Sequence, residues 1–363
     1  SIARSYLGAG ECYFELSRYP EALLYLDSAL SLQAQALPSR LFSETADAFA
    51  IKAKVMAAQH RFEEAIVMLD SALYSCGYHK KGNWNVITAP RQFLSAFHQK
   101  AALYFSLYDQ TRQETSLLSA ILLFDTAAQA VRYFRNTLLE SESRAVLAGQ
   151  FRDILSGGVK AALAMHQLHP DNPAYLNQAF AFSEQSKALV LLEGVRSAGA
   201  LKFEGISDSL LDLERALRQA VTDAEVGLRK LLGRGNGVAD SILTKAKNEV
   251  FDRQRAFESF QRTLASGDFA QYYNFRYGLS LASPAEIQDQ LLQPQRTLVS
   301  YFLGKKGDLF AFVVQKNGAQ AIQCPAGEDL AKQVQLLREG LLGYYTLPSR
   351  KRTEALFVKT LDQ

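Results

Sequence analysis

The residues best suited to chemistry are few and far apart in this sequence. Cys76 and His79 have the Cys-x-x-His spacing of half a zinc site, but no second pair of ligands follows them. Cys324 ends a predicted strand and has no histidine near it in sequence, so the base that a cysteine nucleophile needs cannot be identified. The other histidines are His60, His98, His166 and His169. The sequence therefore predicts neither a metal site nor a catalytic residue.

Phosphate-binding sequences are also absent. No G-x-x-x-x-G-K-[ST] or G-x-G-x-x-G sequence opens a helix. Gly233, Gly235 and Gly237 alternate between two predicted helices without a preceding strand, which indicates a flexible turn rather than a phosphate cradle. We therefore expect no cofactor.

Charge and composition narrow the possible partners. The 363 residues carry 40 Lys and Arg against 37 Asp and Glu, and the basic residues are spread among acids, so no nucleic-acid footprint stands out. No apolar run approaches the roughly 20 residues that a membrane span needs. The cysteines are odd in number and far apart, which favours a reducing compartment, and we expect a cytoplasmic location. Because the chain begins at Ser1, we expect it to be part of a longer protein.

The strongest pattern is a repeat. The segment from Tyr19 to Leu30 returns 43 residues later, from Phe62 to Leu73, with seven residue types in the same slots. A weaker third copy runs from Ala120 to Ala127. This period is typical of solenoids built from stacked helix pairs. The helical spacing continues to about Arg196, with an expected break at Gly157-Gly158 and a fourth helix pair over residues 159–169 and 175–195.

The repeated units resemble the tetratricopeptide repeat, whose small residues let two helices approach closely. In the first unit the matching residues are Tyr6, Gly10, Tyr13, Tyr19, Ala22, Leu26 and Ala29. In the second unit they are Phe49, Ala53, Met56, Phe62, Ala65, Leu69 and Ala72. In the third unit they are Phe97, Ala101, Tyr104, Ala120, Phe124 and Ala127. Lys52 replaces the usual Leu, so we expect a degraded packing layer, and the third unit needs an insertion between its helices.

Beyond the repeats the pattern changes twice. Residues 208–264 read as a charge-rich helical hairpin. Ser283-Pro284-Ala285-Glu286 is a capping box that opens a short helix ending near Gln293. The period then becomes two in three strand-like runs, which predict a β-meander: Thr297 to Leu303, Leu309 to Gln315 and Ala319 to Cys324. Two last helices are expected over residues 329–342 and 353–361.

The predicted fold class is therefore mainly α, in three parts. Residues 1–200 are predicted to form a TPR-like α-solenoid, and residues 201–282 a helical hairpin or linker. Residues 283–363 are predicted to form the first part of an incomplete α/β domain, because three strands and one or two helices make only a small core with exposed sheet edges.

Several of these segments together resemble the bacterial CHAT-domain proteins, in which tetratricopeptide repeats precede a caspase-like and separase-like domain. The most specific parts are the phrase Ser183 to Glu193, with its Glu-x-x-Lys-Ala-x-x-Leu-Leu pattern, and the run from Gln290 to Gly304. The resemblance covers most of the chain from about Ala161 onward. It implies that the parent protein is a cysteine peptidase. The family's His and Cys dyad lies beyond the helix that begins near Thr353, so neither residue maps onto this sequence, and we assign no catalysis to it.

The resemblance also implies a concave groove lined by the first helix of each pair. The residues at the matching slots are Arg4, Glu11, Phe14, Asp47, Lys54 and His98. Mixed charges with an aromatic side chain predict a protein or peptide ligand, held by charges at the rim and one apolar anchor. The alternative for each residue is an ordinary solvated side chain.

The leading hypothesis is thus a protein-binding and regulatory region of a CHAT-type cysteine peptidase. A second hypothesis is a purely structural adaptor whose CHAT-like end is vestigial. A third, in which Cys324 hydrolyses a substrate with an unidentified histidine, is the least supported by the sequence.

Overall fold

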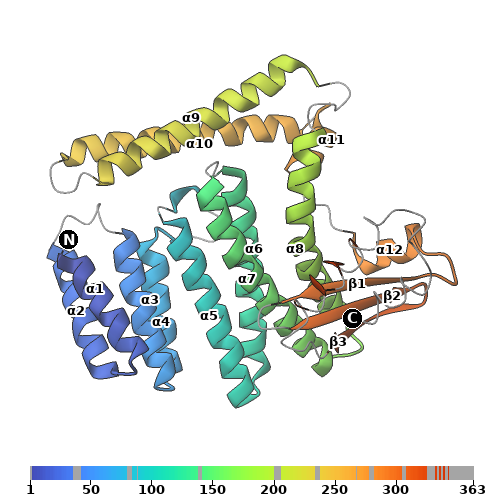
Figure 1. Ribbon diagram of the computed structural model, residues 1–363, viewed down its shortest axis with the longest axis horizontal. Coiled ribbons are helices and arrows are strands. Elements are labelled where there is room, and N and C mark those ends of the chain that lie inside the picture. Colours follow the sequence, from blue (N-terminus) through green and yellow to red (C-terminus); the bar gives the residue numbers. More distant parts are fainter. Residues whose placement is uncertain are drawn as a thin grey trace. The chain divides into compact units, whose positions relative to one another are not determined.

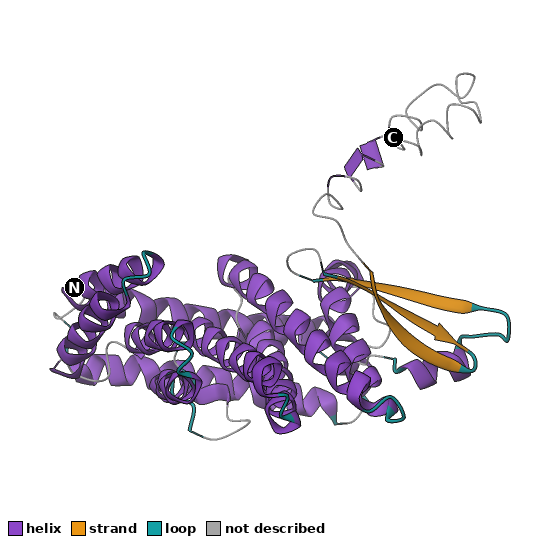
Figure 2. Cartoon of the chain, turned by 90° about the horizontal axis from the view of Figure 1, so that it is seen from below, coloured by secondary structure: helices purple, strands orange, loops and turns teal. Residues whose placement is uncertain are grey.

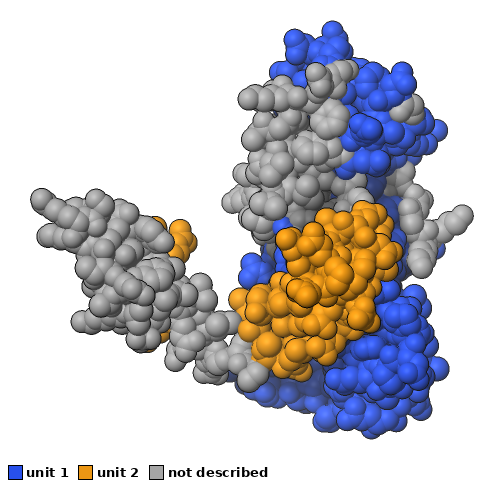
Figure 3. Space-filling model, turned by 90° about the vertical axis from the view of Figure 1, so that its right-hand side faces the viewer, with its two compact units in different colours: residues 1–283 blue, residues 284–363 orange. Residues whose placement is uncertain are grey.

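The computed structural model is mainly helical, with a small three-stranded antiparallel sheet near the C-terminus (Figure 2). It describes residues 2–35, 42–79, 84–87, 89–137, 141–199, 206–233, 238–266, 268–277, 282–304 and 308–324, with six single positions between 332 and 342. The chain divides into two compact units, residues 1–283 and residues 284–363 (Figure 3).

The first part of unit 1 is a row of eight helices (Figure 1). Their bounds are α1 (Ile2–Glu15), α2 (Tyr19–Gln35), α3 (Phe42–Ala58), α4 (Phe62–Ser75), α5 (Pro90–Thr111), α6 (Glu114–Thr137), α7 (Ser141–Leu168) and α8 (Pro173–Gly199). A short 3-10 helix, η2 (Trp84–Val86), precedes α5. Each helix packs against the next, and the odd-numbered helices α1, α3, α5 and α7 also contact one another along the row.

The repeated sequence builds the same core in α2, α4 and α6. Each copy buries two alanines around one larger apolar residue, and the three sets are Ala22, Leu26 and Ala29; Ala65, Leu69 and Ala72; Ala120, Phe124 and Ala127. Because alanine adds little volume, the neighbouring helix can approach closely at these positions. The hydroxyl groups of Ser28, Ser71 and Thr126, which also share one slot, each donate a hydrogen bond to the carbonyl four residues earlier.

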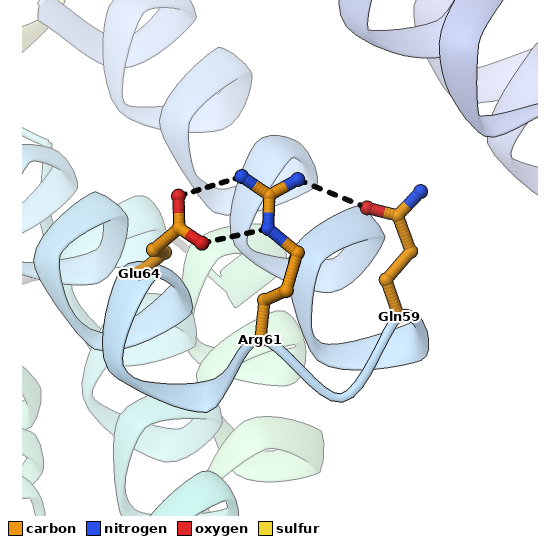
Figure 4. A network of polar contacts seen from close by, with 3 residues as sticks. All are labelled: Gln59, Arg61 and Glu64. Carbon is orange, nitrogen blue, oxygen red and sulfur yellow. Dashed lines mark hydrogen bonds and ion pairs between the residues drawn. The ribbon is translucent and has the colours of Figure 1, made fainter.

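The turns between paired helices repeat as well. Ser17, His60 and Arg112 all have a left-handed backbone, with φ of 58°, 61° and 57°. In the second turn Arg61 forms a two-pronged ion pair with Glu64, Nε to Oε1 at 2.7 Å and a terminal nitrogen to Oε2 at 2.6 Å, and its other nitrogen reaches Gln59 (Figure 4). The equivalent Arg18 pairs with Glu21 in the first turn.

The expected insertion in the third unit is a lengthening of both helices at the end that they share. The left-handed turn residue comes four residues after Tyr13 in the first unit but eight after Tyr104 in the third. In α6 the large core residue, Phe124, lies ten residues after the helix start, against seven for Leu26 in α2. The turn itself is one residue shorter than in the first two pairs, so the insertion lies in α5 and α6, which are each about one helical turn longer there.

The expected break at Gly157-Gly158 is wrong. Helix α7 runs without interruption through both glycines, so the first helix of the fourth pair begins at Ser141 rather than at residue 159, and its partner is α8. A Cβ added at Gly157 would overlap the ring of Phe124 on α6, and one at Gly158 would lie 2.9 Å from the ring of Phe182 on α8. The glycines are present because aromatic rings from both neighbouring helices lie against the α7 backbone.

The packing layer that Lys52 was expected to degrade is instead closed by an ion pair. The Lys52 side chain on α3 is only 15% exposed, and its Nζ lies 2.6 Å from Oδ1 of Asp27 on α2. Lys100 on α5 makes the same contact with Asp70 on α4. Asp27 and Asp70 occupy one slot of the repeated sequence, so the same polar contact joins successive helix pairs twice.

The rest of unit 1 is a helical hairpin of α9 (Asp208–Gly233) and α10 (Asp240–Ala265), followed by α11 (Ala270–Arg276). Its core contains a buried carboxylate, Glu214, which accepts a hydrogen bond from the Tyr272 hydroxyl at 2.6 Å and lies 3.1 Å from Arg218. The Tyr133 hydroxyl on α6 donates to Glu258 on α10 at 2.6 Å, which ties the hairpin to the helix row. The expected turn at residues 234–237 lies outside the described residues.

Unit 2 confirms the predicted antiparallel β-meander. Its helix α12 (Pro284–Gln290) begins at the predicted capping box and ends three residues earlier than expected. The strands β1 (Thr297–Leu303), β2 (Leu309–Gln315) and β3 (Gly318–Cys324) form a sheet in that order. Helix α12 packs on β2, whose buried side chains include Phe310, Phe312 and Val314. The six described positions between 332 and 342 are helical, and residues 353–361 lie outside the described part.

One described helix is long and apolar enough to cross a membrane by length and composition alone. It is the stretch Glu114–Phe134 of α6, and 56% of its most apolar window is buried inside the protein. A core helix with an apolar outer side passes the same test, so this is weak evidence for a span.

Candidate functional site

All six residues that the sequence places in a groove lie on odd-numbered helices. Arg4 and Glu11 lie on α1, and Asp47 and Lys54 occupy the same two slots on α3, with the opposite sign of charge at each slot. Because α1 and α3 contact each other, these slots form a surface of mixed charge.

Arg4 is fixed by a residue that the sequence did not single out. Its Nε lies 3.5 Å from Oε1 of Glu44 on α3, and the Glu44 side chain is 15% exposed. The second carboxylate oxygen of Glu44, Oε2, is buried and has no hydrogen-bond partner among the described residues. A buried carboxylate oxygen without a donor is costly, so a positive charge that approaches the Glu44 carboxylate would stabilise it.

Asp47 is the most perturbed acid on this face. Burial raises its pKa above the usual range, and the hydrogen bond from Gln92, at 3.2 Å, and the charge of Arg91 counteract this only in part. Glu11 and Glu44 raise the pKa further, because like charges disfavour ionisation. A cation placed beside Asp47 would relieve this repulsion.

Helix α7 extends the same face with a polar side chain. Gln150 donates its side-chain amide to the carbonyl of Arg91 on α5 at 3.3 Å, and its own Oε1 is buried without a partner among the described residues. Buried acceptor oxygens therefore occur on both α3 and α7, on either side of α5.

Two of the expected groove residues lie elsewhere. The half-buried Phe14 packs against the core of the first helix pair, with its ring centroid 6.3 Å from that of Tyr19 on α2. The half-buried His98 turns toward α6, with its ring 6.3 Å from that of Phe124. Lys54 is exposed on α3. Arg4, Glu11, Asp47 and Lys54 thus remain on the face formed by α1 and α3, without the expected aromatic anchor.

The residues that sequence reasoning missed are Glu44, Arg91 and Gln92. Glu44 lies three residues before Asp47 on α3, and Gln92 occupies the slot on α5 that corresponds to Glu44 on α3, by the register that relates Lys52 to Lys100. Glu44 could have been found because it lies one turn before Asp47, on the same helix face. Gln92 and Arg91 lie six and seven residues before His98, so no such spacing marks them.

The cysteines and histidines form no reactive centre in the described part of the chain. Cys76 is fully buried, and burial raises the pKa of its thiol to about 12, so it stays protonated at neutral pH. His79 packs edge-on against Tyr74, and the ring of His169 lies 2.9 Å from Glu114. Within the described ranges, no three His, Cys, Asp or Glu side chains are grouped as metal ligands would be.

Comparison with known proteins leaves this geometry as the main guide to function. No model of a known protein family matches the chain, and no curated protein matches it.

Proposed function

We propose that this chain is the protein-binding and regulatory region of a CHAT-type cysteine peptidase. In this proposal α1 to α8 form a TPR-like solenoid, and its odd-numbered helices line the concave face that takes a protein or peptide. The observation that supports it best is the repetition of one helix-pair design: a left-handed turn, a buried alanine pair and an ion pair to the next unit.

The ligand that this face suits best carries a cationic group. Glu11, Glu44 and Asp47 hold carboxylates near one another from α1 and α3, and burial already disfavours the charge of Asp47. A lysine or arginine side chain, or an amino terminus, would place a positive charge beside these carboxylates and lower the cost of ionising Asp47. Arg4 at the rim adds a contact for an acidic group of the same ligand.

Charge reversal tests the binding face. We expect the double substitution Arg4→Glu and Lys54→Glu to change the partners that are recovered with the chain and identified by mass spectrometry. Both residues are exposed, so the fold should survive. The matched control reverses two exposed arginines elsewhere in unit 1, Arg112→Glu and Arg215→Glu. Unchanged partners in the first variant would remove the face from consideration.

The peptidase part of the proposal depends on two segments. One is the sequence from Ser183 to Glu193, and the other is the set of strands in unit 2, whose antiparallel meander is compatible with the start of a CHAT-like domain. The test is a thiol-reactive peptide probe applied to the longer protein. Labelling of a cysteine beyond residue 363 would support a peptidase if the labelling is lost when a histidine after the preceding strand is substituted. Absence of both residues from the longer sequence would favour the structural adaptor.

A further inference from the structure

A row of exposed apolar side chains lies on the even-numbered helices. Leu24 on α2, Val67 on α4 and Leu122 on α6 are 65%, 56% and 60% exposed. Each comes three residues before the aspartate of its sequence copy, so the three occupy one slot. We call these three residues the outer row. Single exposed leucines are common on protein surfaces, but an apolar residue retained at the same exposed slot of all three copies indicates a shared role.

Helix α6 widens the outer row. Leu118 lies one turn before Leu122 and is also exposed. The same helix is apolar enough to resemble a membrane span, because leucines lie on its outward side as well as on its core side. Only 56% of its most apolar stretch is buried. The outward side of α6 is therefore more apolar than packing against α5 and α7 requires.

The charged residues on the helices of the outer row are almost all acidic, although bases from neighbouring segments pair with several of them. Helices α2 and α4 contain glutamate and aspartate but no lysine or arginine, and α6 has no basic residue before Arg132. Asp27 and Asp70 bond lysines of the next odd-numbered helix, yet their side chains remain 60% and 56% exposed. The outer row is thus flanked by acids that can still be reached from outside.

We propose that the outer row is a docking surface for a basic amphipathic helix of a partner protein. The apolar face of such a helix would cover Leu24, Val67 and Leu122, and its lysines or arginines would meet the flanking acids. An anionic lipid surface is the less suitable occupant, because the acids would repel it. The outer row is separate from the odd-helix face, so the two sites can succeed or fail independently.

The test uses a synthetic 18-residue peptide with leucines at helical spacing and lysines elsewhere, and follows its fluorescence anisotropy as the full chain is added. We expect saturable binding, at least tenfold weaker for the triple variant Leu24→Ser, Val67→Ser and Leu122→Ser. The matched control removes three exposed leucines outside the outer row, in Leu16→Ser, Leu168→Ser and Leu213→Ser, and should change the affinity less than twofold. Equal loss in both variants, or no loss in the first, overturns the proposal.

Further measurements distinguish a partner helix from a lipid surface or a second copy of the chain. Circular dichroism checks that the triple variant folds. If the triple variant does not fold, the single substitution Val67→Ser is tested in its place and should weaken peptide binding about threefold. A peptide with glutamates in place of the lysines should not bind. Phosphatidylserine vesicles that bind the chain through the outer row, or self-association that the triple variant abolishes in sedimentation, would overturn the proposal in favour of a lipid surface or a second copy. Loss of peptide binding in Asp47→Asn would place the lysine-rich peptide on the odd-helix face and would also overturn the proposal.

Discussion

The junctions between successive helix pairs are closed in two different ways. From the first pair to the second, and from the second to the third, a lysine with a nearly buried stem reaches an exposed aspartate: Lys52 to Asp27, and Lys100 to Asp70. From the third pair to α7, the ring of Phe124 lies directly on the backbone at Gly157. The first design tolerates change because water can replace the lysine, whereas the second depends on close packing that cannot adjust easily.

The largest expected effect is at the aromatic junction. Gly157→Ala should lower the free energy of unfolding by about 1–3 kcal/mol, because the added methyl overlaps the Phe124 ring. Urea unfolding measures it. Gly149→Ala, on the same helix with nothing within 4 Å of the added carbon, is the control and should be neutral or stabilising by up to about 1 kcal/mol. If both variants behave alike, the ring does not lie against Gly157.

A smaller effect is expected inside the first helix pair. A Cβ at Gly10 would lie 2.7 Å from Cγ of Leu26, a flexible side chain, and the second pair already accommodates a methyl at the corresponding Ala53. Gly10→Ala should therefore cost about 1 kcal/mol, near the low end of overpacking. Gly8→Ala, which meets nothing within 4 Å, is the matched control. A loss at Gly10 larger than that at Gly157 would show that packing inside a helix pair is less adjustable than packing at the aromatic junction.

The ion-pair junctions should contribute less. Double-mutant cycles with Lys52→Met and Asp27→Asn, and with Lys100→Met and Asp70→Asn, should each give a coupling energy of about 0.2–1 kcal/mol that falls as salt is added. In the third copy, Asp125 accepts a hydrogen bond from Gln129 on its own helix at 2.7 Å. Asp125→Asn should therefore be nearly neutral. Coupling energies that differ strongly between the two cycles would show that the junctions are not equivalent.

The last effect is a pH dependence at Asp47, which lies on α3, the helix that also carries Lys52. Its pKa is raised in the folded chain, so its contribution to stability is complete below the unfolded pKa of about 3.9 and is lost as pH rises through the folded value. Asp47→Asn should match the parent protein at acidic pH and be the more stable of the two at neutral pH. Unfolding curves between acidic and neutral pH test this, and a constant difference across that range would contradict it.

Much of the fold could be predicted because its signals are local. The slots from Ala22 to Ala29 and from Ala65 to Ala72 follow from helical spacing, and the meander follows from alternation between turn residues. The errors came from residues whose meaning depends on a distant partner. Gly157-Gly158 predicts a helix break in sequence, but the Phe124 ring packs against Gly157 within a continuous helix. Lys52 predicts a packing defect, but it forms an ion pair with Asp27.

The candidate site was predictable only in part for the same reason. The slots of Arg4 and Asp47 follow from the repeat, but their partners Glu44 and Gln92 come from neighbouring helices, and no spacing within one helix shows that these pairs meet. Phe14 occupies the slot expected for an aromatic anchor, but its ring packs against Tyr19 on the next helix, toward the core.

The lengthening of α5 and α6 has a consequence for how this array can change. Four extra residues precede the left-handed residue of this turn and three follow it, and each number is close to the 3.6 residues of one helical turn. The side chains farther along both helices therefore keep their orientation. The shared end of a helix pair is therefore a place where the chain can grow without disturbing what lies on either side. Equal additions at the turns around Ser17 and His60 should be accepted for the same reason, which makes these turns natural points for grafting new sequence into the protein.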